Sequence, residues 1–140
     1  MLSSAPMSTD LPVPPITPET APYWNGARDG KLLLQRCGEC RAVRFYPRAL
    51  CPSCWSTQVD WIEASGRGRV HSFTIIRRPP APSFAARVPY VVALIDLDEG
   101  PRMMANIVGD GALDVGMDEP VTLTFETRGD VTLPQFERVR

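Results

Sequence analysis

The sequence predicts a mainly β protein in which a small cysteine-containing module precedes a closed β-barrel. Three observations lead to this fold class. All four cysteines fall in two C-x-x-C pairs between Cys37 and Cys54, and short β-rich segments separated by turns follow from residue 57 onward. The 15 prolines among 140 residues also restrict long helices, because proline removes a backbone donor and clashes inside a helix.

Length and charge narrow the class of protein further. A chain of 140 residues allows one domain with a small appended module. A net charge of −1 argues against a dedicated nucleic-acid binder, which normally carries a basic excess. No apolar run approaches the ~18 residues of a membrane span. The N-terminus lacks a basic segment followed by an apolar stretch, so we expect no signal peptide and a cytoplasmic location.

The N-terminal region is expected to contain an arm and one short helix. Residues 1–16 are rich in proline and serine and predict a flexible arm. Residues 17–35 predict a helical segment and a lead-in strand. Thr17 can cap a helix over 18–27, with a proline in the favourable first position. Tyr23 and Trp24 would anchor this helix to the rest of the protein.

Residues 36–56 predict a zinc ribbon. Two C-x-x-C knuckles that face each other complete a tetrahedral Zn²⁺ shell, and the ligands are Cys37, Cys40, Cys51 and Cys54. Four thiolates leave no open position, so the zinc would be structural; disulfides or an iron–sulfur centre are the alternatives. The formal −2 charge of such a centre could be offset by the nearby arginines Arg36, Arg41, Arg44 and Arg48.

Residues 57–140 predict the barrel domain. Its expected strands cover 59–64, 68–78, 90–97, 102–108, 121–126 and, as a last edge strand, 133–139. The connection 109–120 has room for at most one helical turn. An OB-fold is a five-stranded Greek-key barrel of this size, although strand count alone does not separate it from an SH3-like barrel or a small sandwich.

The order of these parts resembles a known family. The matching stretches are YWNGARDGKLLLQRCGEC, FYPRALCPSC, VPYVVALIDLDEG, VGMDEPVTLTFE and LPQF, which together cover most of residues 22–136. They are similar to small proteins in which a rubredoxin-like zinc ribbon precedes a five-stranded OB-fold and which accompany thiolase-fold enzymes acting on acyl-CoA. One departure is that Arg41 and Trp55 follow their knuckles where glycine is common.

The resemblance implies a function for the whole chain. It implies a non-catalytic accessory subunit that docks on a thiolase or a lipid-transfer-type aldolase and helps form its acyl-CoA channel. Within this frame, loop 77–89 is the candidate contact with acyl-CoA or the partner. Arginines can meet CoA phosphates and aromatic rings can flank an adenine or acyl chain, and the residues concerned are Arg77, Arg78, Phe84, Arg87 and Tyr90. The alternative is a rigid proline-rich loop with solvated arginines.

Other function classes find less support in the sequence. His71, the only histidine, is expected to be a hydrogen-bonded strand residue, and the acids at 96–99 are typical of a solvated turn. No catalytic residue is predicted, which argues against independent acyl-CoA hydrolysis or transfer. Binding of single-stranded nucleic acid is the rival function, since zinc ribbons and OB-folds both occur there. It would require a basic groove, whereas 16 acids here outnumber 15 bases.

Overall fold

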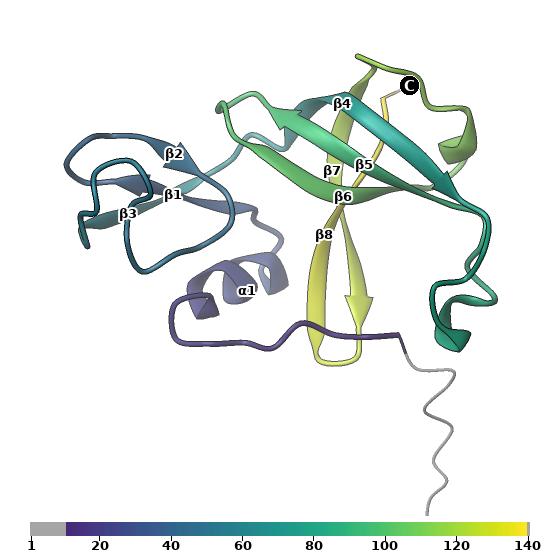
Figure 1. Ribbon diagram of the computed structural model, residues 1–140, viewed down its shortest axis with the longest axis horizontal. Helices are drawn as coiled ribbons and strands as arrows, with labels where there is room; N and C mark the ends of the chain where they lie inside the picture. The colour runs from purple at the N-terminus through teal and green to yellow at the C-terminus, as the bar shows by residue number, and fades with distance from the viewer. Residues whose placement is uncertain (1–10, 140) are drawn as a thin grey trace, which may run out of the picture.

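The computed structural model describes residues 11–139 and consists of two β units bridged by one short helix (Figure 1). A three-stranded sheet lies on one side of the molecule and a closed barrel on the other, with helix α1 (Ala21–Arg28) below and between them. The first ten residues of the expected arm 1–16 lie outside the described residues. No helix in the described part of the chain is long and apolar enough to cross a bilayer.

Helix α1 begins one turn later than predicted. Thr17 does not cap it; instead residues 17–20 form a preceding turn, in which the Thr17 backbone N–H donates to Thr20 Oγ1 at 2.9 Å. The predicted anchors are confirmed, because the exposed fractions of Tyr23 and Trp24 are only 2% and 7%. The helix is therefore held by its aromatic face rather than by a side-chain cap.

The small sheet contains three antiparallel strands in the order β2-β1-β3. They are β1 (Leu33–Cys37), β2 (Val43–Arg44) and β3 (Val59–Glu63). Strand β3 was expected within 57–140 as part of the barrel domain, but it pairs with β1 through Cys37↔Val59 to Leu33↔Glu63. The boundary between the two sheets thus lies between β3 and β4, after the predicted division at residue 57.

The barrel has five strands in the order β4-β5-β6-β8-β7, closed by pairing between β7 and β4. The strands are β4 (Arg67–Ile76), β5 (Tyr90–Leu97), β6 (Arg102–Val108), β7 (Pro120–Arg128) and β8 (Val131–Arg138). This is the five-stranded Greek-key arrangement expected of an OB-fold. The connection between β6 and β7 holds one 3-10 turn, η3 (Ala112–Asp114), as predicted.

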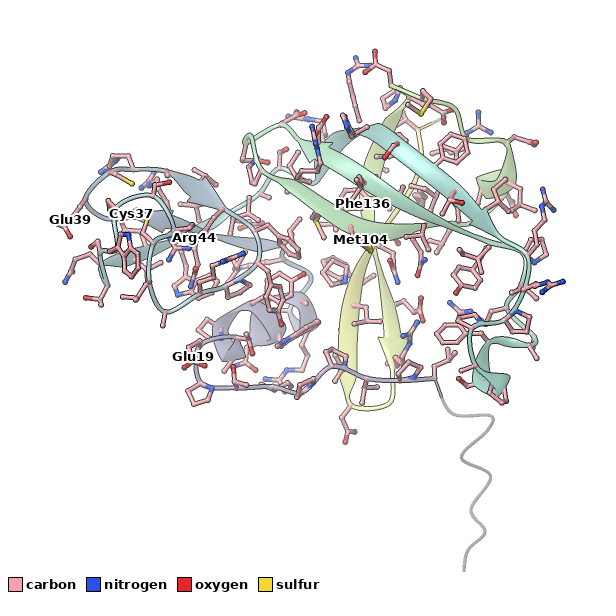
Figure 2. All side chains as sticks on the ribbon, in the orientation of Figure 1. Glu19, Cys37, Glu39, Arg44, Met104 and Phe136 are labelled. Carbon is pink, nitrogen blue, oxygen red and sulfur yellow. The ribbon has the colours of Figure 1, made fainter. Side chains whose placement is uncertain are left out.

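Strand β8 is not the edge strand that the sequence predicted. It pairs antiparallel with β7 along its whole length and parallel with β6 at Ile107↔Phe136 and Val108↔Glu137. The parallel contact closes the ring, so both sides of β8 are hydrogen-bonded where it passes β6. Phe136 is fully buried and labelled at the centre of the barrel in Figure 2.

The barrel core is built by alternation along its strands. In β5 the buried residues are Val91, Ala93, Ile95 and Leu97, while the intervening residues are only partly buried. The outer face of β5 is therefore partly open to solvent. The outer faces of β5, β6 and β8 contribute residues to the cavity described in the next subsection.

Candidate functional site

The four cysteine sulfurs form a compact cluster at the end of the ribbon sheet, where Figure 2 labels Cys37. The Sγ atoms of Cys37 and Cys54 lie 3.5 Å apart, those of Cys40 and Cys51 lie 3.6 Å apart, and all four are within 4.8 Å of one another. A tetrahedron with zinc–sulfur bonds of ~2.3 Å needs sulfur–sulfur separations of ~3.8 Å. A disulfide needs ~2.05 Å, so the cluster fits a metal and not two disulfides.

Backbone N–H groups point at the first sulfur of each knuckle. Cys37 Sγ accepts from the N–H groups of Glu39 and Cys40, each at 3.4 Å. Cys51 Sγ accepts from the N–H of Ser53, also at 3.4 Å. Such donors stabilise negative charge on sulfur, which is the form that binds a metal.

The acidity of the thiols follows from these contacts. The backbone N–H groups of Cys40 and Glu39 lower the pKa of Cys37 to about 6. The Ser56 backbone N–H acts to lower the pKa of Cys54, but hydrogen bonding to the Cys37 sulfur and burial outweigh it and raise that pKa to about 12. Four thiolates this close would repel one another, and a divalent cation bound between them offsets that repulsion.

Both knuckles adopt the expected turn without glycine. Arg41 and Trp55 have φ values of 70° and 67°, in the left-handed region that favours glycine. Their N–H groups donate to the carbonyls of Cys37 at 3.1 Å and Cys51 at 2.8 Å, which closes each knuckle. The absence of glycine therefore leaves the knuckle geometry intact, and the Trp55 side chain is 77% exposed.

Arg44 contributes to the ribbon in a different way from the one predicted. It is buried, and its Nε donates to Gln35 Oε1 at 2.8 Å rather than to a sulfur. The same oxygen accepts from the Arg48 backbone N–H at 2.8 Å. Arg44 therefore ties the loop after β2 to strand β1, and its hydrogen bonds do not support the expected role of offsetting the thiolate charge.

Three of the five residues predicted to contact acyl-CoA, Phe84, Arg87 and Tyr90, have a side-chain partner within the described residues, whereas Arg77 and Arg78 have no ion pair there. The rings of Phe84, in the 3-10 turn η2 (Pro82–Phe84), and Tyr90 stack with centroids 5.6 Å apart. Arg87 is paired with Glu126 on β7 at 3.2 Å. Arg77 and Arg78 are exposed at the end of β4, and the structure gives them no ion pair within residues 11–139.

A cavity of about 350 Å³ lies between α1, the residues after β2 and the outer face of the barrel. Its apolar lining consists of Tyr23, Trp24, Phe45, Tyr46, Phe84, Tyr90, Val92, Met103, Met104, Ala105, Leu133 and Pro134. Its polar lining consists of Asn106, Arg128 and Gln135. Of these residues, only Phe84 and Tyr90 were predicted from the sequence to be binding residues. Among the lining residues, Met104 on β6 (Figure 2) is 64% exposed, and its sequence context gave no indication of the cavity.

The polar groups of the cavity bond to one another. The Gln135 side chain accepts from the Asn106 backbone N–H at 2.7 Å and donates to Asn106 Oδ1 at 3.1 Å. Arg128 donates to Glu126 at 2.8 Å. Burial acts to raise the pKa of Glu126, but the hydrogen bonds from Arg128 and Arg87 outweigh it and keep that pKa low. Glu126 thus stays ionised and is shared between Arg128 and Arg87.

The other titratable cluster lies on the outer surface of the barrel. His71 Nδ1 is 3.4 Å from Asp96 Oδ2, and Arg102 Nε donates to Asp96 Oδ1 at 2.6 Å. The Arg102 contact is the main reason that the pKa of Asp96 is lowered. All three side chains are between 43% and 49% exposed. They form a solvated cross-strand contact, as expected for a strand histidine with a hydrogen-bonding partner.

Comparison with known families matches both parts of the chain in order. Residues 24–60 match the family described as the ChsH2 rubredoxin-like zinc ribbon domain. Residues 61–126 match the family described as the ChsH2 C-terminal OB-fold domain. The ribbon match and the sulfur geometry agree, so the chain binds structural zinc through Cys37, Cys40, Cys51 and Cys54.

Relatives and solved structures agree with these matches. A probable enoyl-CoA hydratase alpha subunit of Thermomonospora curvata is 39% identical over 89% of this chain, which spans only 39% of that relative. The benzoylsuccinyl-CoA thiolase subunit BbsA of Thauera aromatica is 31% identical over 79% of this chain and 68% of its own length. The solved structure described as "Ltp2-ChsH2(DUF35) aldolase" contains a chain that is similar to this one at a TM-score of 0.80 and 36% identity. The match covers 90% of this chain and 98% of that chain. The chain therefore belongs to the ChsH2 (DUF35) family, in which a rubredoxin-like zinc ribbon is joined to an OB-fold domain.

Proposed function

We propose that this chain is a non-catalytic accessory subunit that docks on a thiolase-fold enzyme, either a thiolase or a lipid-transfer-type aldolase, in the cytoplasm and helps form its acyl-CoA channel. The observation that carries the proposal is the likeness at TM-score 0.80 to nearly the whole of one chain in an Ltp2–ChsH2 aldolase structure. Relatives described as a thiolase subunit and a hydratase alpha subunit, both of enzymes for CoA thioesters, support the same role.

The metal site supports an accessory rather than a catalytic role. Four thiolates fill the tetrahedral shell of zinc, so no position is left for a substrate or an activated water. The zinc binding energy instead stabilises the fold of the ribbon. The ribbon in turn carries the residues after β2 that pack on α1 and line the cavity.

Arg77 and Arg78 are proposed as contacts for CoA phosphates. Five other arginines of the barrel region, Arg67, Arg87, Arg102, Arg128 and Arg138, each have a carboxylate partner, and Arg69 donates to the Asp118 backbone carbonyl. Arg77 and Arg78 are exposed and have none within the described residues. A guanidinium without a carboxylate partner is free to bind phosphate oxygens in the bidentate geometry that arginine favours.

The test is acyl-CoA turnover by the complex of this chain with its partner enzyme. Substituting Arg77 and Arg78 together by alanine should raise KM about tenfold or more while kcat changes little, because two charge-assisted contacts to the phosphates are lost. Arg67→Ala is the matched control, since Arg67 is an exposed arginine at the other end of β4. Unchanged KM in the double variant would remove the proposed phosphate contact.

The rival function is binding of single-stranded nucleic acid. It requires stacking rings along a basic groove. Six of the eleven aromatic rings of this chain instead gather in a cavity whose one cationic lining residue, Arg128, is paired with Glu126. We therefore expect no salt-sensitive mobility shift of single-stranded DNA or RNA at micromolar protein. A shift that weakens steeply with salt would favour the rival function.

A further inference from the structure

We propose that the cavity between α1 and the barrel is a binding site for an uncharged, ring-bearing apolar group, and that this chain holds the group by itself. The lining residues of the cavity come from α1, the residues after β2, the turn η2, and strands β5, β6, β7 and β8. The site is distinct from the zinc cluster, whose cysteines do not line it.

The volume of the cavity sets the size of the ligand. An engineered apolar cavity of ~150 Å³ in another protein stays dry and takes up one benzene molecule. At about 350 Å³, the cavity here has more than twice that volume. It therefore suits a group of two fused rings or a branched chain of similar bulk, and it is too small for a whole CoA thioester.

Aromatic rings form two separate parts of the lining. On the side of α1, Tyr23 meets Trp24 edge-to-face at a centroid distance of 4.8 Å and Tyr46 at 5.5 Å. On the side of the loop, Phe84 and Tyr90 stack at 5.6 Å with their planes 28° apart. Ring edges and faces presented from two sides favour a planar ligand, since each aromatic pair adds ~0.5–1.5 kcal/mol beyond area burial.

Methionines provide the adaptable part of the lining. Met103 is buried, whereas Met104 is 64% exposed. Methionine has three rotatable bonds and a polarisable sulfur, so it adjusts to ligands of different outline and packs well on ring edges. The exposure of Met104 beside the cavity would be explained if its side chain covers a ligand in the bound form.

The polar lining indicates that the bound group carries no charge. The amides of Asn106 and Gln135 are hydrogen-bonded to each other, and the Arg128 guanidinium already donates to Glu126 and to the Pro12 carbonyl. A carboxylate or ammonium inside the cavity would lose its hydration without gaining a free ionic partner from these side chains. Trp24 Nε1, a buried donor that has no hydrogen-bond partner among the described residues, is neutral. In the context of the complex, the natural ligand would be the ring-bearing acyl end of a CoA thioester; this last identification rests on the proposed function, whereas the site itself does not.

The test is calorimetric titration of the full-length zinc-loaded chain, without any partner enzyme, with 2-acetylnaphthalene and with 2-naphthoate. The two probes share a fused ring system and differ in charge. We expect saturable 1:1 binding of the neutral ketone and at least tenfold weaker binding of the carboxylate. Absence of saturable binding of 2-acetylnaphthalene, or equal affinity for both probes, would overturn the proposal. Docking on a thiolase-fold enzyme is measured separately, so failure of either proposal leaves the other testable.

Variants locate the probe. Met104→Trp places a large ring at the opening and should weaken binding of 2-acetylnaphthalene at least tenfold. Met117→Trp is the matched control, because Met117 is also exposed, at 62%, but does not line the cavity; it should bind as the original chain does. Phe84→Ala removes one ring from a turn without buried residues and should weaken binding several-fold. Unchanged affinity in both Met104→Trp and Phe84→Ala would show that the probe binds elsewhere.

Discussion

The stacked rings of Phe84 and Tyr90, with centroids 5.6 Å apart, place the loop between β4 and β5 beside the open cavity between α1 and the barrel. Tyr90 is the first residue of β5, so one ring stands on the rigid barrel and the other on the proline-rich loop. The stack is thus the point at which the loop is fixed to the scaffold.

Replacing Phe84 by alanine should release this loop without unfolding the barrel. A stacked pair contributes ~0.5–1.5 kcal/mol, so amide hydrogen exchange in residues 83–88 should become roughly two- to tenfold faster. The melting temperature should change little, because η2 contains no buried residue. Tyr90→Phe, which keeps the ring, is the matched control and should leave exchange in the loop unchanged. Equal exchange in Phe84→Ala and the original chain would show that the stack does not fix the loop.

Removal of zinc should unfold the ribbon. The binding energy of a structural Zn²⁺ site is folding energy of the order of 10–16 kcal/mol, and Cys37 ends strand β1, which pairs with both β2 and β3. After chelation verified by metal analysis, far-UV circular dichroism should show loss of the structure of residues 36–55, and the melting temperature of the whole chain should fall. Zinc re-addition should restore both. An unchanged spectrum and melting curve would rule out a structural role.

Glycine at either knuckle position should stabilise the chain. Arg41 and Trp55 adopt left-handed φ values, which cost ~1–2 kcal/mol for a side-chain-bearing residue, whereas the extra chain entropy that glycine loses costs ~0.5–1 kcal/mol. Arg41→Gly and Trp55→Gly should each raise the free energy of unfolding by up to ~1 kcal/mol in urea titrations of the zinc-loaded chain. Glu39→Gly, at an exposed neighbouring position without positive φ, should not. A loss of stability in both knuckle variants would contradict this.

Acid should weaken the contact between Glu119 and Arg138. The hydrogen bond from Arg138 holds the pKa of Glu119 below its ordinary value of 4.5. The ionised carboxylate therefore stabilises the fold above about pH 4.5, and this contribution is lost as the pH falls through the lower, folded-state pKa. The melting temperature of Glu119→Gln should be below that of the original chain at pH 7, and the gap should narrow below pH 4.5. Glu137→Gln, an exposed carboxylate on the same strand as Arg138, is the control. A gap that stays constant with pH would contradict the assignment.

The parts of the fold that depend on local sequence were predictable. Strands β5 and β6 match the predicted ranges 90–97 and 102–108, because β-rich segments and the Asp98–Pro101 turn specify a hairpin locally. The four zinc ligands were predictable for the same reason, since the spacing of each pair alone builds a knuckle.

The parts that depend on distant contacts were not. Strand β8 was predicted as an edge because its parallel pairing of Ile107 with Phe136 joins segments far apart in the chain and leaves no periodic trace. Strand β3 pairs across the ribbon with β1 for a similarly non-local reason. The cavity combines side chains from the helix, the ribbon, the turn η2 and four barrel strands, so its residues share no spacing that a sequence pattern could reveal.

The central claim, that this chain is the accessory subunit of a thiolase-fold enzyme, is tested most directly by affinity purification from the native source at native expression. Bound proteins would be identified by mass spectrometry, and acyl-CoA turnover of the purified partner would be measured with and without this chain. We expect that a thiolase-fold enzyme co-purifies in a fixed ratio and that its acyl-CoA turnover depends on the chain. Co-purification with nucleic-acid enzymes instead, or a thiolase-fold partner whose turnover is the same without the chain, would contradict it.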